Sequence, residues 1–287
     1  MEYLNLPQSP LTDYMLSQQN LSPISLLACY LLGVLRIAPI VAIAPFMGAK
    51  VMPMPVRAGF AFLLGLVFLP QVMATATQEV MMSPAYLGLL MKELGIGLFL
   101  AFLGSIPFFI VQSSGIIIDF MRGSSQLMSQ DPTMQNQVSS IGILYNYILI
   151  YMFFQLDGFL LFFDAVENSF SFISIDQFIP SRFFLLNQEP YLFFSELLGK
   201  LFALSIQLAA PCILAILMAE FFLGIANRLA PQVQIAFLGM SLKSLMGLFL
   251  LWMGWQFILK NVILESLNFL KSVNLLIDQL IKISHAK

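Results

Sequence analysis

The chain has 287 residues, of which 59% are hydrophobic and only 10% are charged. Soluble domains carry about 25% charged residues, so this composition excludes an ordinary soluble protein and predicts a chain that lies in lipid or against other apolar protein. The formal net charge is −2, and the basic residues form no run. A nucleic-acid-binding surface is excluded, because phosphate binding needs clustered positive charge.

Few residues are available for catalysis or metal binding. The single histidine, His285, lies at the C-terminal end, and the two cysteines, Cys29 and Cys212, lie in separate apolar stretches. Zinc sites and activated nucleophiles usually need a histidine or a group of cysteines close to other functional side chains. We therefore expect no enzymatic activity, no metal site and no cofactor.

The hydrophobic residues are gathered in stretches that are long enough to cross a bilayer. A spanning helix needs about 20 apolar residues, and six windows of this kind occur, at 21–47, 58–77, 94–118, 138–156, 201–219 and 229–259. The mean hydropathy of the whole chain is +0.89. Because backbone groups in lipid must find partners within the protein, the windows predict an all-α, membrane-embedded fold.

The windows divide the chain into consecutive parts. These are a polar N-terminal segment at 1–20, a helical part at 21–156, a polar and aromatic excursion at 157–200, a C-terminal helical hairpin at 201–260 and an amphipathic helix at 261–287. We expect the excursion to lie outside the membrane, because it carries most of the charge between the two helical parts. The last helix is apolar on one face, which favours a position on the membrane surface or on a partner.

Prolines fall well inside three of the windows, with Pro39 and Pro45 in the first, Pro107 in the third and Pro211 in the fifth. Each proline removes a backbone donor and bends the helix, and lipid cannot satisfy the carbonyl groups that are freed. We therefore expect broken helical hairpins that pack inside an assembly. The alternative is that prolines are simply commoner in membrane helices than in soluble ones.

Five charged residues lie within or at the rim of the apolar windows, namely Arg36, Glu93, Glu220, Arg228 and Lys243. Charges in such places are costly, and they usually face the interior of a helix bundle or an aqueous path. Two interpretations remain open, which are structural ion pairs between helices and a role in transport.

Small, polar and flexible residues are concentrated after the apolar stretch around Pro107. The mixture of glycine, serine, methionine and glutamine is a poor lipid-facing surface, and it favours a flexible loop that lines a cavity. The candidate gating residues in this region are Gly115, Asp119, Met121, Arg122, Gly123, Met128, Asp131 and Pro132. Asp119 and Arg122 are three residues apart and can pair on one helix face. The alternative interpretation is an ordinary solvent-exposed loop.

Many of these residues belong to one ordered series. The N-terminal members are Arg36, Pro39, Pro45, Gly48, Val51, Pro53, Val56, Arg57, Pro70, Glu93, Gly95, Gly97, Gly104, Gly115, Asp119, Gly123, Asp131 and Pro132. The C-terminal members are Ala210, Pro211, Gly224, Arg228, Ala230, Pro231, Gln232, Gly239 and Lys243. In order and spacing, the series resembles the FliR/SctT family, a core membrane component of the type III secretion export apparatus. The resemblance covers roughly 25–260.

The details of the resemblance favour one branch of the family. The run Leu242, Lys243 and Ser244 is closer to the injectisome branch than to the flagellar branch. Gln234, Ala236 and Ser241 depart from the usual family pattern, which concerns the bend of the last hairpin.

The resemblance implies an export gate in the bacterial inner membrane. The gate would contain FliP/SctR-like and FliQ/SctS-like subunits next to an FlhB/SctU-like switch protein, and unfolded secreted proteins would pass through it. The region 106–131 would correspond to a plug in the channel. Structural and inter-subunit roles would fall to Arg36, Pro39, Pro45, Pro53, Arg57, Glu93, Pro107, Pro211, Arg228, Pro231, Gln232 and Lys243. The alternative function is a small-solute secondary transporter, with a midplane site that uses Arg36 or Lys243.

Overall fold

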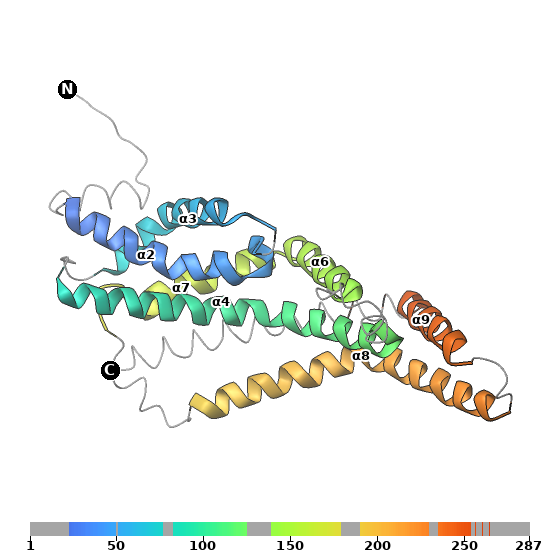
Figure 1. Ribbon diagram of the computed structural model, residues 1–287. Helices are drawn as coiled ribbons and strands as arrows, with labels where there is room; N and C mark the ends of the chain where they lie inside the picture. The colour runs from blue at the N-terminus through green and yellow to red at the C-terminus, as the bar shows by residue number, and fades with distance from the viewer. Residues whose placement is uncertain are drawn as a thin grey trace. The chain divides into compact units, whose positions relative to one another are not determined.

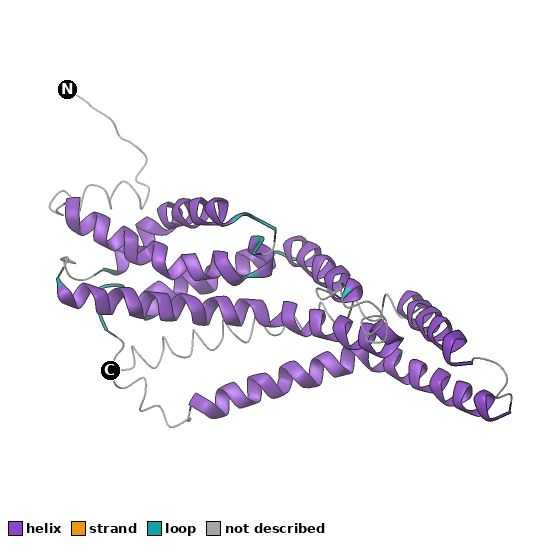
Figure 2. Ribbon diagram, in the orientation of Figure 1, coloured by secondary structure: helices purple, strands orange, loops and turns teal. Residues whose placement is uncertain are grey.

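The computed structural model describes residues 23–49, 51–76, 83–124, 139–178, 190–229 and 235–253, together with Gln256, Lys260 and Leu264. Within these residues the regular structure is entirely helical and contains no strand (Figure 2). The all-α fold predicted from the apolar windows is therefore confirmed.

The helical elements follow one another along the chain (Figure 1). They are α2 (Pro23–Ile43), the 3-10 turn η1 (Pro45–Met47), α3 (Met54–Thr75), α4 (Pro84–Asp119), the π-helical turn η2 (Phe120–Ser124), α6 (Ser140–Gln155), α7 (Gly158–Phe172), α8 (Pro190–Leu229) and α9 (Ile235–Met253). Pro53 directly precedes α3. Among the described helices, α2, α3, α4 and α8 are long and apolar enough to cross a membrane, and a fifth span results if α6 and α7 count as one interrupted span.

Three of the four prolines that were expected to break helices lie inside uninterrupted ones. Pro39 lies in α2, Pro107 in α4 and Pro211 in α8. The expectation of breaks at these positions is wrong, because a proline removes one backbone donor, whereas ending the helix would leave several backbone groups without partners in apolar surroundings. The chain turns instead after α2, where Pro45 begins η1 and Gly48 has a φ of 75°.

The chain forms two compact units that are not consecutive in the sequence. Of the described residues, unit 1 contains those up to Ser105 and those at 159–178, and unit 2 contains those at 106–158 and those from 190 onward. Helix α4 therefore contributes its first part to unit 1 and its second part to unit 2. This division differs from the consecutive parts expected from the sequence, because segments that are far apart along the chain pack together.

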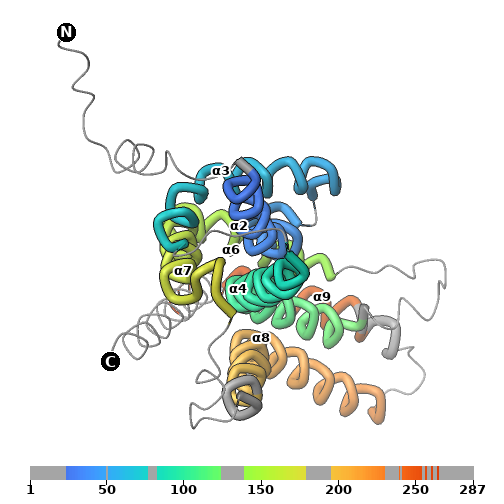
Figure 3. Tube along the Cα trace, turned by 90° about the vertical axis from the view of Figure 1, so that its left-hand side faces the viewer, coloured from blue at the N-terminus to red at the C-terminus, as the bar shows by residue number. Residues whose placement is uncertain are grey.

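Unit 1 is built around α2, which contacts both α3 and the first part of α4 (Figure 3). The hydroxyl of Tyr30 on α2 donates a hydrogen bond to the carbonyl oxygen of Phe62 on α3, at 2.9 Å. The hydroxyl of Tyr86 on α4 donates to the carbonyl oxygen of Ala28 on α2, at 3.0 Å. These bonds fix both neighbours against the apolar face of α2.

Helix α7 completes the core of unit 1. Phe162 and Phe170 are buried, and Phe163 stacks on Phe68 of α3 with ring centroids 5.4 Å apart. The segment 157–200, expected to be an excursion outside the membrane, thus contains a helix whose apolar face belongs to the core of unit 1, and its place relative to the membrane stays a prediction. The charged residues of α7 lie between its apolar positions, so the local charge density is a poor guide to where the helix packs.

Unit 2 combines the second part of α4 with α6, α8 and α9. The ring of Phe108 on α4 meets that of Phe153 on α6 edge to face, with centroids 5.5 Å apart. Ser205 Oγ on α8 donates to the carbonyl oxygen of Ile110 on α4 at 3.2 Å. Helices α8 and α9 pack on each other as a hairpin, and α8 begins eleven residues before the expected start of that hairpin at 201, since Pro190 is its first residue.

Several sequence predictions lie outside the described residues. They are the polar segment at 1–20, the amphipathic helix at 261–287 apart from Leu264, and the candidate site residues Met128, Asp131, Pro132, Pro231 and Gln232.

Candidate functional site

A fully buried ion pair joins α2 to α4 in unit 1. Neither the side chain of Arg36 on α2 nor that of Glu93 on α4 has exposed surface. Arg36 Nε donates to Glu93 Oε2 at 2.5 Å, and Arg36 Nη2 donates to Glu93 Oε1 at 2.9 Å. Two parallel bonds to one carboxylate suit the planar guanidinium, and they offset part of the cost of removing both charges from water.

The rest of the Arg36 guanidinium contacts α7 and the residue that follows it. Nη1 donates to Ser169 Oγ at 3.2 Å, and Nη2 also donates to the carbonyl oxygen of Ile173 at 2.7 Å. The guanidinium carbon lies 4.2 Å from the centroid of the Phe170 ring, a distance at which a cation and an aromatic face attract each other. Arg36 therefore holds α2, α4 and α7 together at one point.

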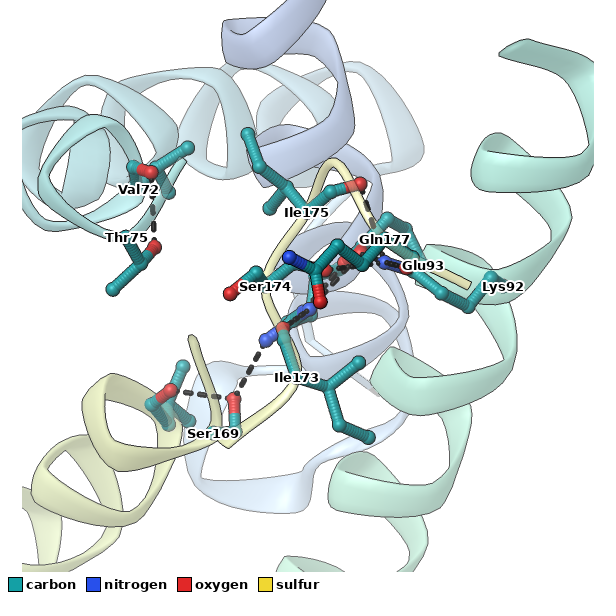
Figure 4. Close-up of polar contacts among 11 residues, drawn as sticks. Val72, Thr75, Lys92, Glu93, Ser169, Ile173, Ser174, Ile175 and Gln177 are labelled. Atoms are coloured by element: carbon teal, nitrogen blue, oxygen red, sulfur yellow. Dashed lines mark hydrogen bonds and ion pairs between the residues drawn. The ribbon is translucent and has the colours of Figure 1, made fainter. Parts of the chain in front are cut away.

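Lys92 extends this site to the turn that follows α7. Its Nζ donates to the carbonyl oxygens of Ser174 at 2.7 Å, Ile175 at 3.2 Å and Gln177 at 2.9 Å, and it lies 2.7 Å from Glu93 Oε1. Figure 4 shows Lys92 and Glu93 on α4 pointing toward this turn. A cation is favourable there, because these buried carbonyl oxygens in an irregular turn need hydrogen-bond donors.

We call Arg36, Lys92, Glu93 and Ser169 the buried charge cluster. Sequence reasoning singles out Arg36 and Glu93, and the structure brings the two together. It misses Lys92, because a lysine just before an apolar window ordinarily extends its charged end to water. The signal that could have identified Lys92 is its position beside Glu93 in an otherwise uncharged stretch. Ser169 gives no signal in the sequence.

A second polar site, in unit 2, joins the end of α4 to the start of α6. Asp119 Oδ2 accepts hydrogen bonds from Ser139 Oγ at 2.6 Å and from the backbone N–H of Ile141 at 3.0 Å. Ser139 Oγ in turn accepts a bond from the backbone N–H of Gly142 at 2.9 Å. The free N–H groups in the first turn of α6 are thus satisfied, and the carboxylate lies at the positive end of the helix dipole.

Arg122 connects this site to α9. It lies in η2, where its Nη1 donates to Asp119 Oδ1 at 3.0 Å and its Nη2 donates to Ser244 Oγ of α9 at 2.7 Å. The next residue, Gly123, has a φ of 102°, a backbone conformation that residues with a β-carbon rarely adopt. We call Asp119, Arg122, Ser139 and Ser244 the Asp119 junction. Sequence reasoning identifies the first two of these residues, misses Ser139, and names Ser244 only as part of the run 242–244, without a contact to η2.

Much of the region expected to be a loop, 106–131, is helical. Helix α4 continues through Asp119 and is followed directly by η2, in which Met121 is half-buried. The loop prediction is wrong for this part, because the glycine serves close packing rather than flexibility. A β-carbon at Gly115 would lie 2.5 Å from the backbone nitrogen of Gly142 on α6.

The remaining charged candidates lie at helix ends and helix contacts. Lys243 on α9 donates to Glu220 Oε1 on α8, so these two window charges form an ion pair. Arg228 is exposed in the last turn of α8, where the helix dipole favours a cation. Arg57 Nη1 on α3 donates to the carbonyl oxygen of Ala42 on α2 at 3.3 Å.

Neither polar site has the composition of a catalytic or metal centre. Across the part of the chain that the structure describes, no three His, Cys, Asp or Glu side chains are grouped closely enough to hold a metal ion. The carboxylates of Glu93 and Asp119 are occupied by cations and N–H or O–H donors. Both sites can position helices, but neither offers a free base beside a nucleophile.

Comparison with known proteins finds relatives among bacterial export proteins. The model of the family described as "Bacterial export proteins, family 1" matches residues 27–267. The Yop proteins translocation protein T of Yersinia pestis is 31% identical over 160 residues, which cover 56% of this chain and 60% of that protein. The secretion system apparatus protein SsaT of Salmonella typhimurium is 27% identical over 182 residues, which cover 63% and 68% of the two chains. The flagellar biosynthetic protein FliR of Bacillus subtilis is 29% identical over 224 residues, which cover 77% and 84%. The matched part of the chain thus spans less than two thirds of the Yersinia relative.

Proposed function

Because the chain belongs to the bacterial export proteins, family 1, we propose that it is a core subunit of the export gate of a type III secretion system. It lies in the bacterial inner membrane, and it forms part of the wall and plug of a channel through which unfolded secreted proteins cross. The observation that carries this proposal is the family match over residues 27–267, which includes the buried charge cluster and the Asp119 junction.

The apolar surface of the chain supports a subunit of an assembly. Only 28% of the apolar window of α3, and the same share of that of α8, is buried within the chain. Leu63, Val67 and Phe221 are among the large side chains left exposed. Helix α8 also exposes Glu220 and Arg228. Lipid does not stabilise such charges, so partner subunits or water must cover this side of α8.

The partners follow from the family. FliP/SctR-like and FliQ/SctS-like subunits complete the gate, and an FlhB/SctU-like switch protein lies next to it. The exposed apolar faces of α3 and α8 offer the kind of surface that such membrane subunits cover. The run Leu242–Ser244 favours an injectisome as the host machine, although the relatives include both a Yop translocation protein and a flagellar protein.

The second part of α4 and η2 form the plug of this gate. The region is a helix with a defined turn, so the plug moves by rearranging helix contacts rather than by bending of a loose loop. The contacts available to such a rearrangement are those of the Asp119 junction, which joins α4, α6 and α9.

Deleting the chain in the bacterium that carries it tests the function. We expect secretion of type III substrates into the medium to stop, because a gate that lacks one wall subunit does not assemble. The measurement is the amount of a secreted substrate in the culture supernatant, with its amount in the cells as a control for synthesis. Supplying the intact chain from a plasmid should restore secretion. Normal secretion in the deletion strain would contradict the proposal, and loss of motility instead of injectisome secretion would place the chain in the flagellar branch.

A further inference from the structure

We propose that the hydrogen bond between Arg122 and Ser244 is a releasable contact through which α9 controls the Asp119 junction. The junction keeps its present arrangement while α9 is docked on η2, and it becomes free to rearrange when α9 moves away. The inference rests on the proposed function in one respect, since it takes this rearrangement to be part of the opening of the gate.

The two bonds of the Arg122 guanidinium differ in kind. Nη1 pairs with the carboxylate of Asp119 at 3.0 Å, whereas Nη2 donates to the neutral hydroxyl of Ser244 at 2.7 Å. A bond between two charged groups is stronger than one in which the acceptor is neutral. Displacing α9 therefore breaks the bond to Ser244 first, and it leaves the charge of Arg122 balanced by Asp119. Breaking the contact therefore leaves no unpaired charge at Arg122 or at Ser244.

On α9, the missing side chain of Gly247 leaves room for the side chain of Arg122. Gly247 is buried and lies one turn after Ser244 on the same face of α9. A β-carbon at Gly247 would lie 3.0 Å from Cγ and Cδ of Arg122, so the stem of the arginine crosses α9 at the glycine. Arg122 Nε is buried there, and no described residue accepts a hydrogen bond from it. The docked contact with α9 therefore uses Nη2 and the stem of the arginine, and release would expose Nε to water.

The residue next to Ser244 ties α9 to α8. Lys243 pairs with Glu220 of α8, so a movement of the α8–α9 hairpin carries Ser244 with it. The two neighbouring side chains of α9 therefore hold different elements, since Lys243 contacts α8 and Ser244 contacts η2. A displacement of the hairpin as one body keeps the first contact and breaks the second.

Helix α8 provides a point about which the hairpin can tilt. In its earlier part, Ser205 Oγ lies 3.2 Å from the carbonyl oxygen of Ile110 on α4, and its one hydrogen is shared between that oxygen and the carbonyl oxygen of Leu201 at 2.7 Å. Pro211 follows, and it removes one backbone hydrogen bond from the helix at an exposed position. Glu220, which pairs with Lys243 of α9, lies after this weakened turn. The part of α8 after Pro211 can therefore bend away while the part before it stays attached to α4.

The test compares two substitutions at Ser244 with a matched control on the same helix. Ser244→Ala removes the hydroxyl acceptor, and we expect potassium efflux from resting cells to rise roughly two- to tenfold, because a net hydrogen bond of ordinary strength shifts a two-state population by about that factor. Ser244→Asp replaces the hydroxyl with a carboxylate, and it should slow secretion by a similar factor because the contact becomes an ion pair. Ser241→Ala, one turn earlier and exposed, should leave both measurements unchanged.

The outcomes separate this inference from the proposed function. If deletion of the chain stops secretion but Ser244→Ala and Ser244→Asp both behave like the intact chain, the contact has no role in opening and the inference is overturned while the function stands. If Ser241→Ala raises efflux as much as Ser244→Ala, the effect is not specific to the contact and the inference is again overturned. The amount of assembled complex, measured by co-purification, is compared in each strain. If the Ser244→Asp variant fails to assemble, the comparison of potassium efflux between Ser244→Ala and Ser241→Ala still tests the inference.

Discussion

Arg36 and Glu93 lie where neither side chain reaches water, so each depends on the other for its charged form to be tolerated. The pair also includes Lys92, whose ammonium lies 2.7 Å from the same carboxylate. One carboxylate thus faces two cations, and backbone carbonyl oxygens together with Ser169 Oγ supply further acceptors. A cluster of this kind stabilises the fold only as a complete set, because removing one member leaves the others buried without compensation.

Replacing the shared carboxylate should therefore be strongly destabilising. Glu93→Gln leaves the guanidinium of Arg36 and the ammonium of Lys92 buried without a counter-charge, and we expect it to cost about 3–5 kcal/mol of folding free energy. Thermal unfolding of the purified subunit complex measures the effect. Glu196→Gln is the matched control, because Glu196 pairs with Lys200 on the exposed surface of α8, where solvent screens the pair and its loss should change stability little. Equal losses in the two variants would show that the buried charge cluster does not stabilise the protein.

At the scale of elements, the decisive feature is the close crossing of α2 and α4. A β-carbon at Gly97 of α4 would collide with the carbonyl oxygen of Arg36 on α2, whereas one at Gly95 would meet nothing within 4 Å. The backbone of α2 cannot move aside without disturbing the ion pair that Arg36 forms. The two helices therefore approach to a separation that only a glycine at this position permits.

This crossing predicts opposite effects at two neighbouring glycines. Gly97→Ala forces the helices apart, and we expect a loss of about 1–3 kcal/mol in stability. Gly95→Ala fills open space in a helix, and it should be neutral or stabilising by up to about 1 kcal/mol because alanine favours the helix more than glycine does. The melting temperatures of the two variant complexes provide the comparison. A pair of variants with the same melting temperature would mean that the helices do not cross at Gly97.

The sequence predicts the elements better than it predicts their ends. Apolar length suffices to predict each of the long helices, because lipid leaves the backbone no other structure. The starts of α4 and α8 are missed because Glu93 and Lys200 directly precede the apolar windows at 94–118 and 201–219. In the structure α4 passes through Glu93, since pairing with Arg36 makes that charge tolerable inside the bundle. The partner of Glu93 is Arg36, which lies 57 residues away in the sequence, so no local pattern predicts the pair.

The polar sites show the same limit. Charges within apolar windows point correctly to Arg36 and Glu93, because their cost is a property of the sequence alone. The roles of Ser139 and Ser244 cannot be predicted in this way, because the role of a serine depends on the hydrogen-bond partner that the fold places beside it. The glycine-rich region around Gly115 is misread as a loop for a related reason, because glycine serves equally for flexibility and for close helix contact.

At the scale of the whole molecule, the chain leaves much of its apolar surface uncovered. Helices α4 and α8 have 36 and 40 residues, which correspond to about 54 and 60 Å of helix, against about 30 Å of hydrocarbon in a bilayer. Neither helix can be accommodated upright within the lipid core alone. The resemblance to the FliR/SctT family is confirmed by the family match, and an assembly of export subunits offers the missing cover.

Stability should therefore depend on the partner subunits. Produced alone in detergent, the chain should aggregate or be degraded, whereas co-expression with FliP/SctR-like and FliQ/SctS-like proteins should yield a monodisperse complex, because in the proposed gate these subunits would bury the exposed faces of α3 and α8. Size-exclusion chromatography of the two preparations, at equal detergent concentration, makes the comparison. A folded, solitary particle of this chain would contradict the subunit role and favour a self-contained transporter.

The ammonium of Lys92 occupies a nest of three carbonyl oxygens, which is the ligand type that potassium and sodium ions ordinarily seek in proteins. Here the cation is tethered to α4 by a covalent stem and is present at every salt concentration. The turn after α7 is consequently held by a cation that belongs to the chain itself and does not have to be supplied from solution.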